Sequence, residues 1–346
     1  MEFVEIDGSF GEGGGQILRS TISLSCVTGR PVRIVNIRRG RPKPGLKPQH
    51  LASVKALARI SGADERGAEP GSQEISFAPG PVRAGEYLFE IGTAGSVVLL
   101  LQAILPPLLF ADGPSRVVLT GGTHVPFGPS YDFLREVFFP RLGAIGVHAS
   151  CDIERYGFYP RGGGKVTAGI DPVGAIRGVD LREKGSVLSV TGRSCVANLP
   201  LSIAERQKDA AVEALAPHSP RIETAAVTAP GKGTFLFLRV ETEAGPAGFF
   251  ALGAVGKRAE EVGREAAREA LAYIESPGAI DPRLADQLLL YLALSKEAST
   301  FTISKVTNHL VTQMHVVRRM LGSRLDVEGR VGEPGTVRLY PRRGPE

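Results

Sequence analysis

The sequence predicts an α/β (α+β) fold built from repeated βαβαββ units, with a smaller α/β domain inserted into the chain. One observation behind this is that apolar residues follow helical and strand spacings in turn along the 346 residues. The other is that a pattern over residues 3–91 recurs, shifted in frame, over 95–170. The first unit is expected to contain strand 3–6, helix 15–27, strand 32–37, helix 49–61, strand 74–78 and strand 87–91.

The opening strand and helix show how these elements are recognised. Phe3-Val4-Glu5-Ile6 alternates like a strand, and residues 16–27 carry apolar side chains at helical spacing. The same reasoning gives the second unit. Its expected elements are helix 95–110, strand 116–120, helix 130–139, strand 146–153 and strand 164–170.

A separate compact pattern follows Pro172. Its elements are strand 186–192, helix 201–216, strands 234–241 and 247–252, and helix 257–275. Pro277-Gly278 and Asp281-Pro282 then mark a boundary, and helix 284–294, strand 300–305, helix 309–321 and a final pair of strands complete a third copy. We therefore predict a main domain of three βαβαββ-type repeats over 1–184 and 277–346, and an inserted smaller α/β domain over 185–276.

Composition places the chain among ordinary globular proteins. Its residues are 42% hydrophobic and 22% charged, and its length allows two or more cores. The longest apolar stretch, 97–110, is broken by Gln102 and two prolines and is shorter than the roughly 20 residues of a membrane helix. We expect a buried helix there and no membrane partner. The amino terminus lacks a basic segment followed by an apolar run, so the expected location is cytoplasmic.

The cysteines and histidines do not form a recognisable metal site. Cys26, Cys151 and Cys195 lack C-x-x-C pairing, which argues against a zinc site and against a disulfide framework. The six histidines match no zinc spacing either. We expect the cysteines to be core thiols.

A glycine-rich turn joins the first strand to the first helix. Four glycines, Gly11, Gly13, Gly14 and Gly15, surround Glu12. Such a turn lets backbone N–H groups approach phosphate oxygens, and Glu12 is placed to hold a divalent cation. The alternative is a turn that only packs a strand against a helix. The turn is not a P-loop, because no Gly-Lys-Ser or Gly-Lys-Thr follows it.

Residues 33–47 form a basic loop. This segment contains Arg33, Arg38, Arg39, Arg41, Lys43 and Lys47 and no acidic residue. With a net charge of +5 and a pI near 9.2, the chain suits a polyanionic partner, since guanidinium groups grip phosphate oxygens in pairs. The alternative is a solvated basic loop.

His309 is the histidine best placed for chemistry. It follows Thr307-Asn308, a good N-cap pair, and opens a helix with an expected buried stripe of Leu310, Met314, Val317 and Leu321. A helix N-terminus disfavours imidazolium, so the ring is expected to stay neutral near pH 7 and able to attack phosphorus. The alternative is a structural or solvent-facing histidine.

Several motifs together resemble the RNA 3′-terminal phosphate cyclase family, and the match runs nearly end to end. It is weakest over residues 185–276. The motifs are Gly11-Glu12-Gly13-Gly14-Gly15-Gln16-Ile17-Leu18-Arg19-Ser20, Arg38-Arg39-Gly40-Arg41-Pro42-Lys43-Pro44-Gly45-Leu46, Gln49-His50-Leu51, Ala111-Asp112-Gly113-Pro114-Ser115, Gly157-Phe158-Tyr159-Pro160-Arg161-Gly162-Gly163-Gly164, Leu284-Ala285-Asp286-Gln287 and His309-Leu310-Val311-Thr312.

The resemblance implies a three-step nucleotidyl transfer in the main domain. ATP adenylylates a histidine, AMP passes to an RNA 3′-phosphate, and the vicinal 2′-OH displaces AMP to leave a 2′,3′-cyclic phosphate. It also implies repeats similar to those of enolpyruvate transferases, although similarity of fold does not transfer chemistry. The implied roles are His309 as nucleophile, Glu12 as ligand of Mg²⁺ or Mn²⁺, Gln102, Pro129, Arg283, Leu284, Ala285, Asp286 and Gln287 at ATP, and Arg19, Arg38, Arg41 and Gln49 at the RNA phosphate.

Two positions depart from the family pattern. Gln313 stands where the family commonly has Asn, and Arg283 stands where an aromatic residue often precedes Leu-Ala-Asp-Gln. The rival interpretation is a noncatalytic branch of the same fold that acts in ribosomal RNA processing. That branch lacks the nucleophilic histidine, whereas this chain keeps His309 with Glu12, so the enzyme interpretation is preferred. Enolpyruvyl transfer ranks third, and the sequence does not fix the oligomeric state.

Overall fold

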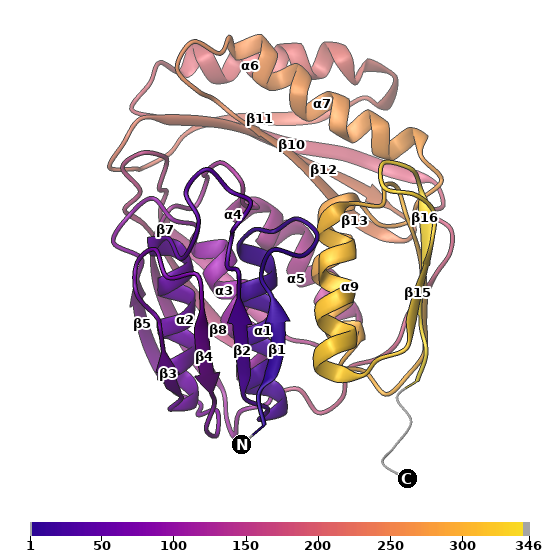
Figure 1. Ribbon diagram of the computed structural model, residues 1–346. Coiled ribbons are helices and arrows are strands. Elements are labelled where there is room, and N and C mark those ends of the chain that lie inside the picture. The colour runs from indigo at the N-terminus through magenta and orange to yellow at the C-terminus, as the bar shows by residue number, and fades with distance from the viewer. Residues whose placement is uncertain (1, 342–346) are drawn as a thin grey trace.

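The computed structural model describes residues 2–341, which form four sheets of four strands each (Figure 1). Three of the sheets share one strand order, namely β1-β2-β4-β3, β5-β6-β8-β7 and β9-β14-β16-β15. In each of these orders the first strand runs parallel to the second, and the third runs antiparallel to both of its neighbours, the second and the fourth. The predicted α/β class with repeated units is therefore confirmed.

The first two units occupy the amino-terminal half of the chain. The first consists of β1 Val4–Asp7, α1 Gly15–Thr28, β2 Val32–Val35, α2 Pro48–Ser61, β3 Asp64–Arg66 and β4 Ile75–Ala78. The second consists of β5 Glu86–Glu90, α3 Val97–Leu108, β6 Ser115–Gly121, a continuous helical segment formed by α4 Tyr131–Phe133, the π-helix η1 Leu134–Phe138 and α5 Phe139–Ala144, and then β7 Ala149–Arg155 and β8 Gly164–Ile170.

The third unit is split by the fourth sheet. It consists of β9 Asp180–Leu181, α8 Pro282–Leu292, β14 Ser299–Ile303, α9 Asn308–Leu321, β15 Leu325–Glu328 and β16 Gly335–Leu339. Between β9 and α8 lie β10 Val187–Ala197, α6 Leu201–Ala214, the 3-10 helix η2 Ala216–His218, β11 Arg221–Ala226, β12 Gly233–Thr242, β13 Gly245–Leu252 and α7 Ala259–Glu275.

The frame of the repeats differs from the one expected. Strand 87–91, predicted as the last strand of the first unit, corresponds to β5, which pairs in parallel with β6 and opens the second unit. The prediction was wrong because β3 has only three residues, Asp64-Glu65-Arg66, which carry no apolar alternation. The two-residue β9 and the strand β11 were missed as well.

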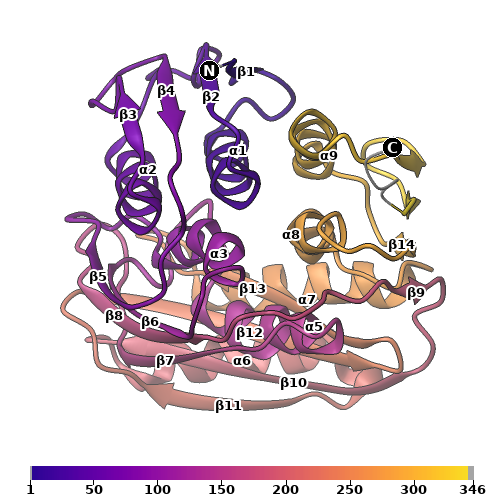
Figure 2. The ribbon, with the colours of Figure 1, turned by 90° about the horizontal axis from the view of Figure 1, so that it is seen from below.

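The helices of the three units meet in the middle of the molecule, and the sheets lie outside them (Figure 2). Helix α1 packs against α2, α3 and α9, and α8 packs against α9. Helix α3 is apolar on every side, and ten of its residues are buried, which explains its central position. The buried helix expected over 97–110 is therefore confirmed.

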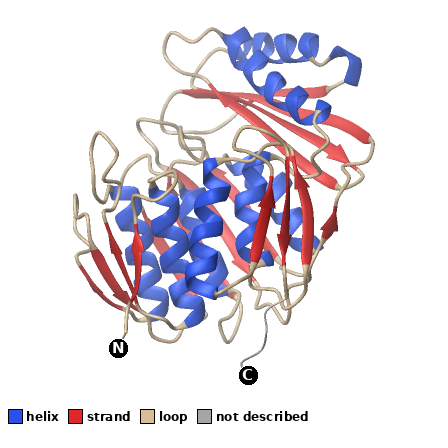
Figure 3. Ribbon diagram, turned by 45° about the vertical axis from the view of Figure 1, so that its right-hand side comes forward, coloured by secondary structure: helices blue, strands red, loops and turns tan. Residues whose placement is uncertain are grey.

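The fourth sheet, in the order β11-β10-β12-β13, is covered on its outer face by α6 and α7 (Figure 3). Strand β12 is buried on both faces. Its Leu236 and Leu238 belong to a cluster beneath these helices, whereas Phe235 and Phe237 join the core of the repeats. The fourth sheet is thus held firmly against the second unit. That residues 185–276 form a domain of their own stays a prediction.

Two expectations drawn from composition can be compared with the described residues. The three cysteines are all buried and free, as expected of core thiols. Among the helices within residues 2–341, none has both the length and the apolar character of a membrane span.

Candidate active site

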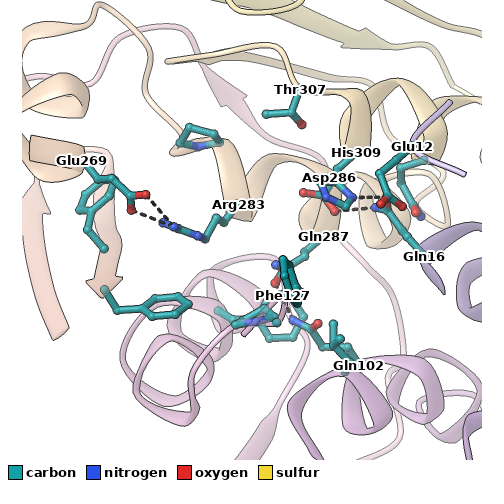
Figure 4. Close-up of a pocket in the computed structure, with 18 of the residues that line it drawn as sticks. Glu12, Gln16, Gln102, Phe127, Glu269, Arg283, Asp286, Gln287, Thr307 and His309 are labelled. Atoms are coloured by element: carbon teal, nitrogen blue, oxygen red, sulfur yellow. Dashed lines mark hydrogen bonds and ion pairs between the residues drawn. The ribbon is translucent and has the colours of Figure 1, made fainter. Parts of the chain in front are cut away.

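A cavity of about 1030 Å³ lies where α1, α3, α8 and α9 meet β13 and α7 of the fourth sheet. Its lining draws on residues from Glu12 to Gly332, so the fold gathers distant segments around one space. In Figure 4, His309, Asp286, Gln16 and Glu12 group together, whereas Gln102 and Gln287 lie beside Phe127. The cavity is large enough for a nucleotide.

The glycine-rich turn borders this cavity and is fixed against α9. Gly11 and Gly13 have φ angles of 63° and 60°, which disfavour residues with a side chain. The Glu12 backbone N–H donates to Thr312 Oγ1 at 2.9 Å, and a Cβ atom on Gly14 would overlap the Glu12 carboxylate. The turn therefore packs α1 against α9 and also holds the Glu12 side chain at the cavity.

His309 lies in the first turn of α9. Thr307 is the N-cap, and its Oγ1 accepts a hydrogen bond from the Leu310 N–H at 3.1 Å. Leu310, Met314 and Val317 are buried as expected, while Leu321 is half-buried. This packing directs the opposite face of the helix, and with it the exposed ring of His309, toward the cavity.

A chain of hydrogen bonds fixes the tautomer of His309. Gln16 Nε2 donates to Asp286 Oδ2 at 2.6 Å, so the amide of Gln16 has to turn its oxygen the other way. That oxygen, Oε1, lies 2.8 Å from His309 Nδ1 and accepts a hydrogen bond from it. Since Nδ1 carries the proton in neutral imidazole, Nε2 keeps its lone pair.

Partial desolvation and the neighbouring positive charges favour the neutral form of His309. Desolvation lowers the pKa of its imidazole below the ordinary value of 6.5, and the positive charges of Arg19 and Arg41 lower it further. Burial also lowers the pKa of Arg19 to about 10, which leaves its guanidinium charged at neutral pH. Burial raises the pKa of Asp286 to about 7, and either protonation state keeps an oxygen that can accept from Gln16.

This electrostatic environment gives a prediction that needs no substrate. As the pH falls, His309 is expected to take up a proton only below pH 6.5, because its folded-state pKa is lowered. An NMR titration of ¹⁵N-labelled histidine, with the His309 signal assigned by its loss in His309→Ala, measures this pKa and the tautomer together. Arg41→Ala should move the pKa upward. A pKa of 6.5 or above, or a proton on Nε2, would contradict the geometry.

Helix α8 presents one polar face to the cavity. Asp286, Gln287 and Arg283 line it, and Gln102 Nε2 donates to Gln287 Oε1 at 2.5 Å. Pro129 lines it as well. Leu284 and Ala285, also expected at ATP, are fully buried in the core and absent from the cavity lining, so their contact with ATP stays a prediction. Helical geometry explains their burial, since residues one or two positions apart face different directions.

Arg283 contacts two other residues of the cavity wall. Its Nη2 lies 2.8 Å from Glu269 Oε2 on α7, and its guanidinium carbon lies 4.8 Å from the ring centre of Phe250 on β13. Arg283 therefore ties α8 to the fourth sheet. Its role as a nucleotide contact stays a prediction.

The basic loop is only partly directed toward the cavity. Arg19 lines the cavity, and Arg41 forms an ion pair with the Glu12 carboxylate and donates to the Glu12 backbone oxygen at 2.8 Å. Arg38 does not reach the cavity. It is buried, and its Nη1 donates to the carbonyl oxygens of Lys43 and Gly45 at 2.8 and 2.9 Å, so it organises the loop.

Gln49 also lies outside the cavity lining. Its Oε1 accepts a hydrogen bond from the Ser96 N–H at 3.2 Å, which holds α2 beside the start of α3. Contacts of Arg38 and Gln49 with an RNA phosphate therefore stay predictions. Arg19 and Arg41 are the two residues of this set whose positive charges lower the pKa of the His309 imidazole.

Comparison with known proteins identifies the family. A profile described as RNA 3′-terminal phosphate cyclase matches residues 10–327. The chain belongs to this family. A relative from Methylococcus capsulatus, named RNA 3′-terminal phosphate cyclase, is 45% identical over 98% of this chain and 97% of its own. A relative of the same name from Pyrococcus furiosus is 43% identical over 96% of this chain and 98% of its own.

Among solved structures, the enolpyruvyl transferase NikO from Streptomyces tendae aligns with this cyclase-family chain at a TM-score of 0.41 and 12% identity. The alignment covers 99% of this chain and 48% of NikO. This likeness is too weak to support any argument. The family membership therefore rests on the sequence comparisons, and it confirms the resemblance inferred from the motifs.

Gln16 is the residue that sequence reasoning missed. It stands within the glycine motif, but nothing local connects it to His309, 293 positions away. Gln313, by contrast, was noted as a departure from the family pattern, and it fits the site. Its Oε1 accepts from Ser20 Oγ at 2.7 Å, which joins α9 to α1 at the cavity wall.

Glu12 is the carboxylate of the cavity lining that was expected to bind a divalent ion. Within residues 2–341, no cluster of three or more His, Cys, Asp or Glu side chains is arranged to hold a metal by itself. Glu12 lines the cavity with its partly exposed carboxylate, and its present partner there is Arg41. This donor set fits Mg²⁺ or Mn²⁺ held jointly with nucleotide phosphates and water.

Proposed function

We propose that this chain converts the 3′-terminal phosphate of RNA to a 2′,3′-cyclic phosphodiester with the consumption of ATP. The relatives named RNA 3′-terminal phosphate cyclase support the substrate and the product. The observation that carries the proposal is the His309 site, where Gln16 holds the Nδ1 proton of the imidazole, Nε2 has no hydrogen-bond partner among the described residues, and the positive charge of Arg19 favours the neutral ring. Such a nitrogen is a suitable nucleophile for phosphorus.

In the first step, His309 Nε2 attacks the α-phosphorus of ATP. The bond between that phosphorus and the oxygen bridging to the β-phosphate breaks, and pyrophosphate leaves. The Nδ1–H stays hydrogen-bonded to Gln16 Oε1, which stabilises the positive charge that develops on the ring. The Arg19 guanidinium offsets negative charge on the phosphoryl oxygens, and the product is AMP bound to His309 through a nitrogen–phosphorus bond.

In the second step, an oxygen of the RNA 3′-phosphate attacks the phosphorus of this AMP. The nitrogen–phosphorus bond breaks, and its electron pair returns to His309 Nε2. In the third step, the adjacent 2′-OH attacks the RNA 3′-phosphorus and loses its proton to water as AMP leaves. The hydroxyl lies on the same ribose as the phosphate, so this step has an intramolecular advantage.

Electrostatics decide whether two phosphates can meet at this site. Mg²⁺ or Mn²⁺, held by Glu12 together with the nucleotide phosphates, would offset negative charge when bound. From the protein itself, Arg19 lines the cavity and Arg41 borders it next to Glu12. These two arginines are the residues best placed to orient the RNA phosphate toward the adenylylated histidine.

The test uses a 5′-labelled RNA that ends in a 3′-phosphate. With ATP and Mg²⁺, the end should become resistant to phosphatase. A matched oligonucleotide with a terminal 2′-deoxyribose should instead accumulate the adenylylated end, because the attacking hydroxyl is missing. If a folded protein leaves the RNA end unchanged and takes up no nucleotide, the noncatalytic role in ribosomal RNA processing gains support.

Arg41→Ala separates the two halves of the reaction. We expect the variant to form the histidine-linked AMP normally but to transfer it to RNA about 10- to 100-fold more slowly, since one charge-assisted contact to the RNA phosphate is lost. Single-turnover transfer from labelled protein to RNA measures this. Arg39→Ala is the matched control, because Arg39 lies on the same loop and bonds to Asn36. If Arg41→Ala slowed both steps equally, the assignment of Arg41 to the RNA phosphate would be wrong.

A further inference from the structure

Phe127 is the most unusual side chain of the cavity lining. Within the described residues, five of the six aromatic side chains in this lining are buried, and Phe127 is the exposed one, with a relative accessibility of 103%. The buried five are Phe138, Phe249, Phe250, Tyr273 and Tyr291. A fully exposed phenyl ring at the edge of a nucleotide-sized cavity offers a flat apolar face that is open to a ligand.

The backbone at Phe127 is strained as well. Its φ angle is 66°, a left-handed conformation that bulky residues rarely adopt. Such strain persists where the surrounding structure enforces it, and it gathers at ligand-binding positions. The conformation therefore has to be imposed by the neighbours of Phe127 in the loop.

The neighbours do fix the loop on both sides. Val125 and Ser130 are buried, and Ser130 Oγ accepts from the Phe133 N–H at 3.2 Å as the cap of α4. A Cβ atom added to Gly128 would lie 3.2 Å from Ser96 Oγ and 3.3 Å from Leu99 Cδ1, so the loop packs tightly on the start of α3. Phe127 is thus presented by a fixed loop, as a preorganised binding surface requires.

The polar groups beside Phe127 suit a heterocyclic base. Figure 4 shows Phe127 next to the hydrogen-bonded amides of Gln102 and Gln287, away from the group that contains His309. In residues 2–341 these two amides form no other side-chain hydrogen bond, so the pair leaves one carbonyl oxygen and one NH₂ group for a ligand. A purine presents complementary donors and acceptors along its edge.

Arg283, which stands where the family often has an aromatic residue, already has partners within the protein. Its guanidinium group is paired with Glu269 and stacked on Phe250. A base that stacked on Arg283 would have only the face of the guanidinium that Phe250 leaves uncovered. Phe127 offers its exposed ring without this restriction.

We propose that Phe127 is the stacking platform for the adenine of ATP, with Gln102 and Gln287 along the base edge. This rests on the proposed function, because it assumes that ATP occupies the cavity with its α-phosphate at His309. It assigns base affinity to a residue on the loop between β6 and α4, and it gives Arg283 a structural role at the fourth sheet. Phe127 thereby sets how strongly the site holds a nucleotide and leaves the phosphoryl chemistry to His309.

Equilibrium binding tests the proposal without any reaction. In a His309→Ala background, which cannot form the covalent adduct, calorimetry measures the affinities for ATP and for inorganic tripolyphosphate, which has no base. Phe127→Ala should weaken ATP binding about 5- to 100-fold, as loss of one base–aromatic stack does, and leave tripolyphosphate binding unchanged. Phe127→Trp should restore ATP binding.

Phe110→Ala is the matched control, because Phe110 is 46% exposed and lies outside the cavity lining. It should leave both affinities unchanged. Equal ATP affinity with and without Phe127, or equal losses for ATP and tripolyphosphate, would overturn the stacking role. The failure of the proposed function looks different: with His309 intact, Phe127→Ala would still weaken ATP binding, but neither it nor the parent would acquire covalent AMP.

Discussion

His309→Ala is expected to abolish conversion of RNA 3′-phosphate ends and to lower formation of covalent AMP by more than about 10⁴-fold, as loss of a nucleophile does. The physical reason is that Nε2 of His309 is the nitrogen with a free lone pair at the cavity, held there by the Nδ1–H bond to Gln16. The measurement is the rate of label transfer from α-labelled ATP to protein and of cyclisation of the RNA.

An RNA whose 3′-phosphate already carries AMP distinguishes loss of the nucleophile from loss of folding or of RNA binding. The third step needs no nucleophile from the protein, so His309→Ala should still cyclise an RNA whose 3′-phosphate already carries AMP. This outcome would also show that the variant folds and binds RNA. If the variant formed covalent AMP at the parental rate, the assignment of His309 would be wrong.

Gln16→Leu is expected to slow the first step about 10- to 100-fold, because a misdirected imidazole loses much of its near-attack geometry. Leucine is apolar and shorter than glutamine, and it has no acceptor for the Nδ1 proton. The ring of His309 then loses its hydrogen bond at 2.8 Å, and the tautomer with the proton on Nε2 becomes accessible. Single-turnover labelling measures the rate, and ¹⁵N shifts of His309 report the tautomer.

Ser20→Ala is the matched control for Gln16→Leu. Ser20 lies on the same helix, lines the same cavity, and bonds to Gln313 rather than to His309. It should leave the tautomer unchanged. If Gln16→Leu reacts at the normal rate although the tautomer of His309 has changed, the tautomer does not control catalysis. If it reacts slowly although the tautomer is unchanged, Gln16 acts in substrate binding instead.

Most of the fold could be predicted because each long element has a clear apolar period. Helix α3 is apolar all round, and α9 carries a buried stripe, so both were expected within a few residues of their observed bounds. The boundaries of the repeats were predicted wrongly because β3 and β9, which have three and two residues, were not recognised as strands. Strands this short are defined by pairing with their neighbours, and a single sequence does not contain that information.

The candidate site was predictable where a residue carries its own signal. His309 has its N-cap pair, and Asp286 and Gln287 lie in a recognisable motif and reach the cavity. Long-range partners had no such signal. The bond between Gln16 and His309 and the pairing of Arg283 with Glu269 depend on which helices the fold brings together. Phe127 stands in a Pro- and Gly-containing loop, where sequence alone does not distinguish an exposed ring from a packed one.

The measurement that tests the account most directly is identification of the adduct. The protein is incubated with α-labelled ATP and Mg²⁺ and denatured, and the labelled peptide is sequenced by mass spectrometry. We predict an acid-labile, alkali-stable AMP group on Nε2 of His309. A folded protein that takes up no label, or that carries AMP on another residue, would contradict the claim that the Gln16–Asp286 pair prepares His309 as the nucleophile.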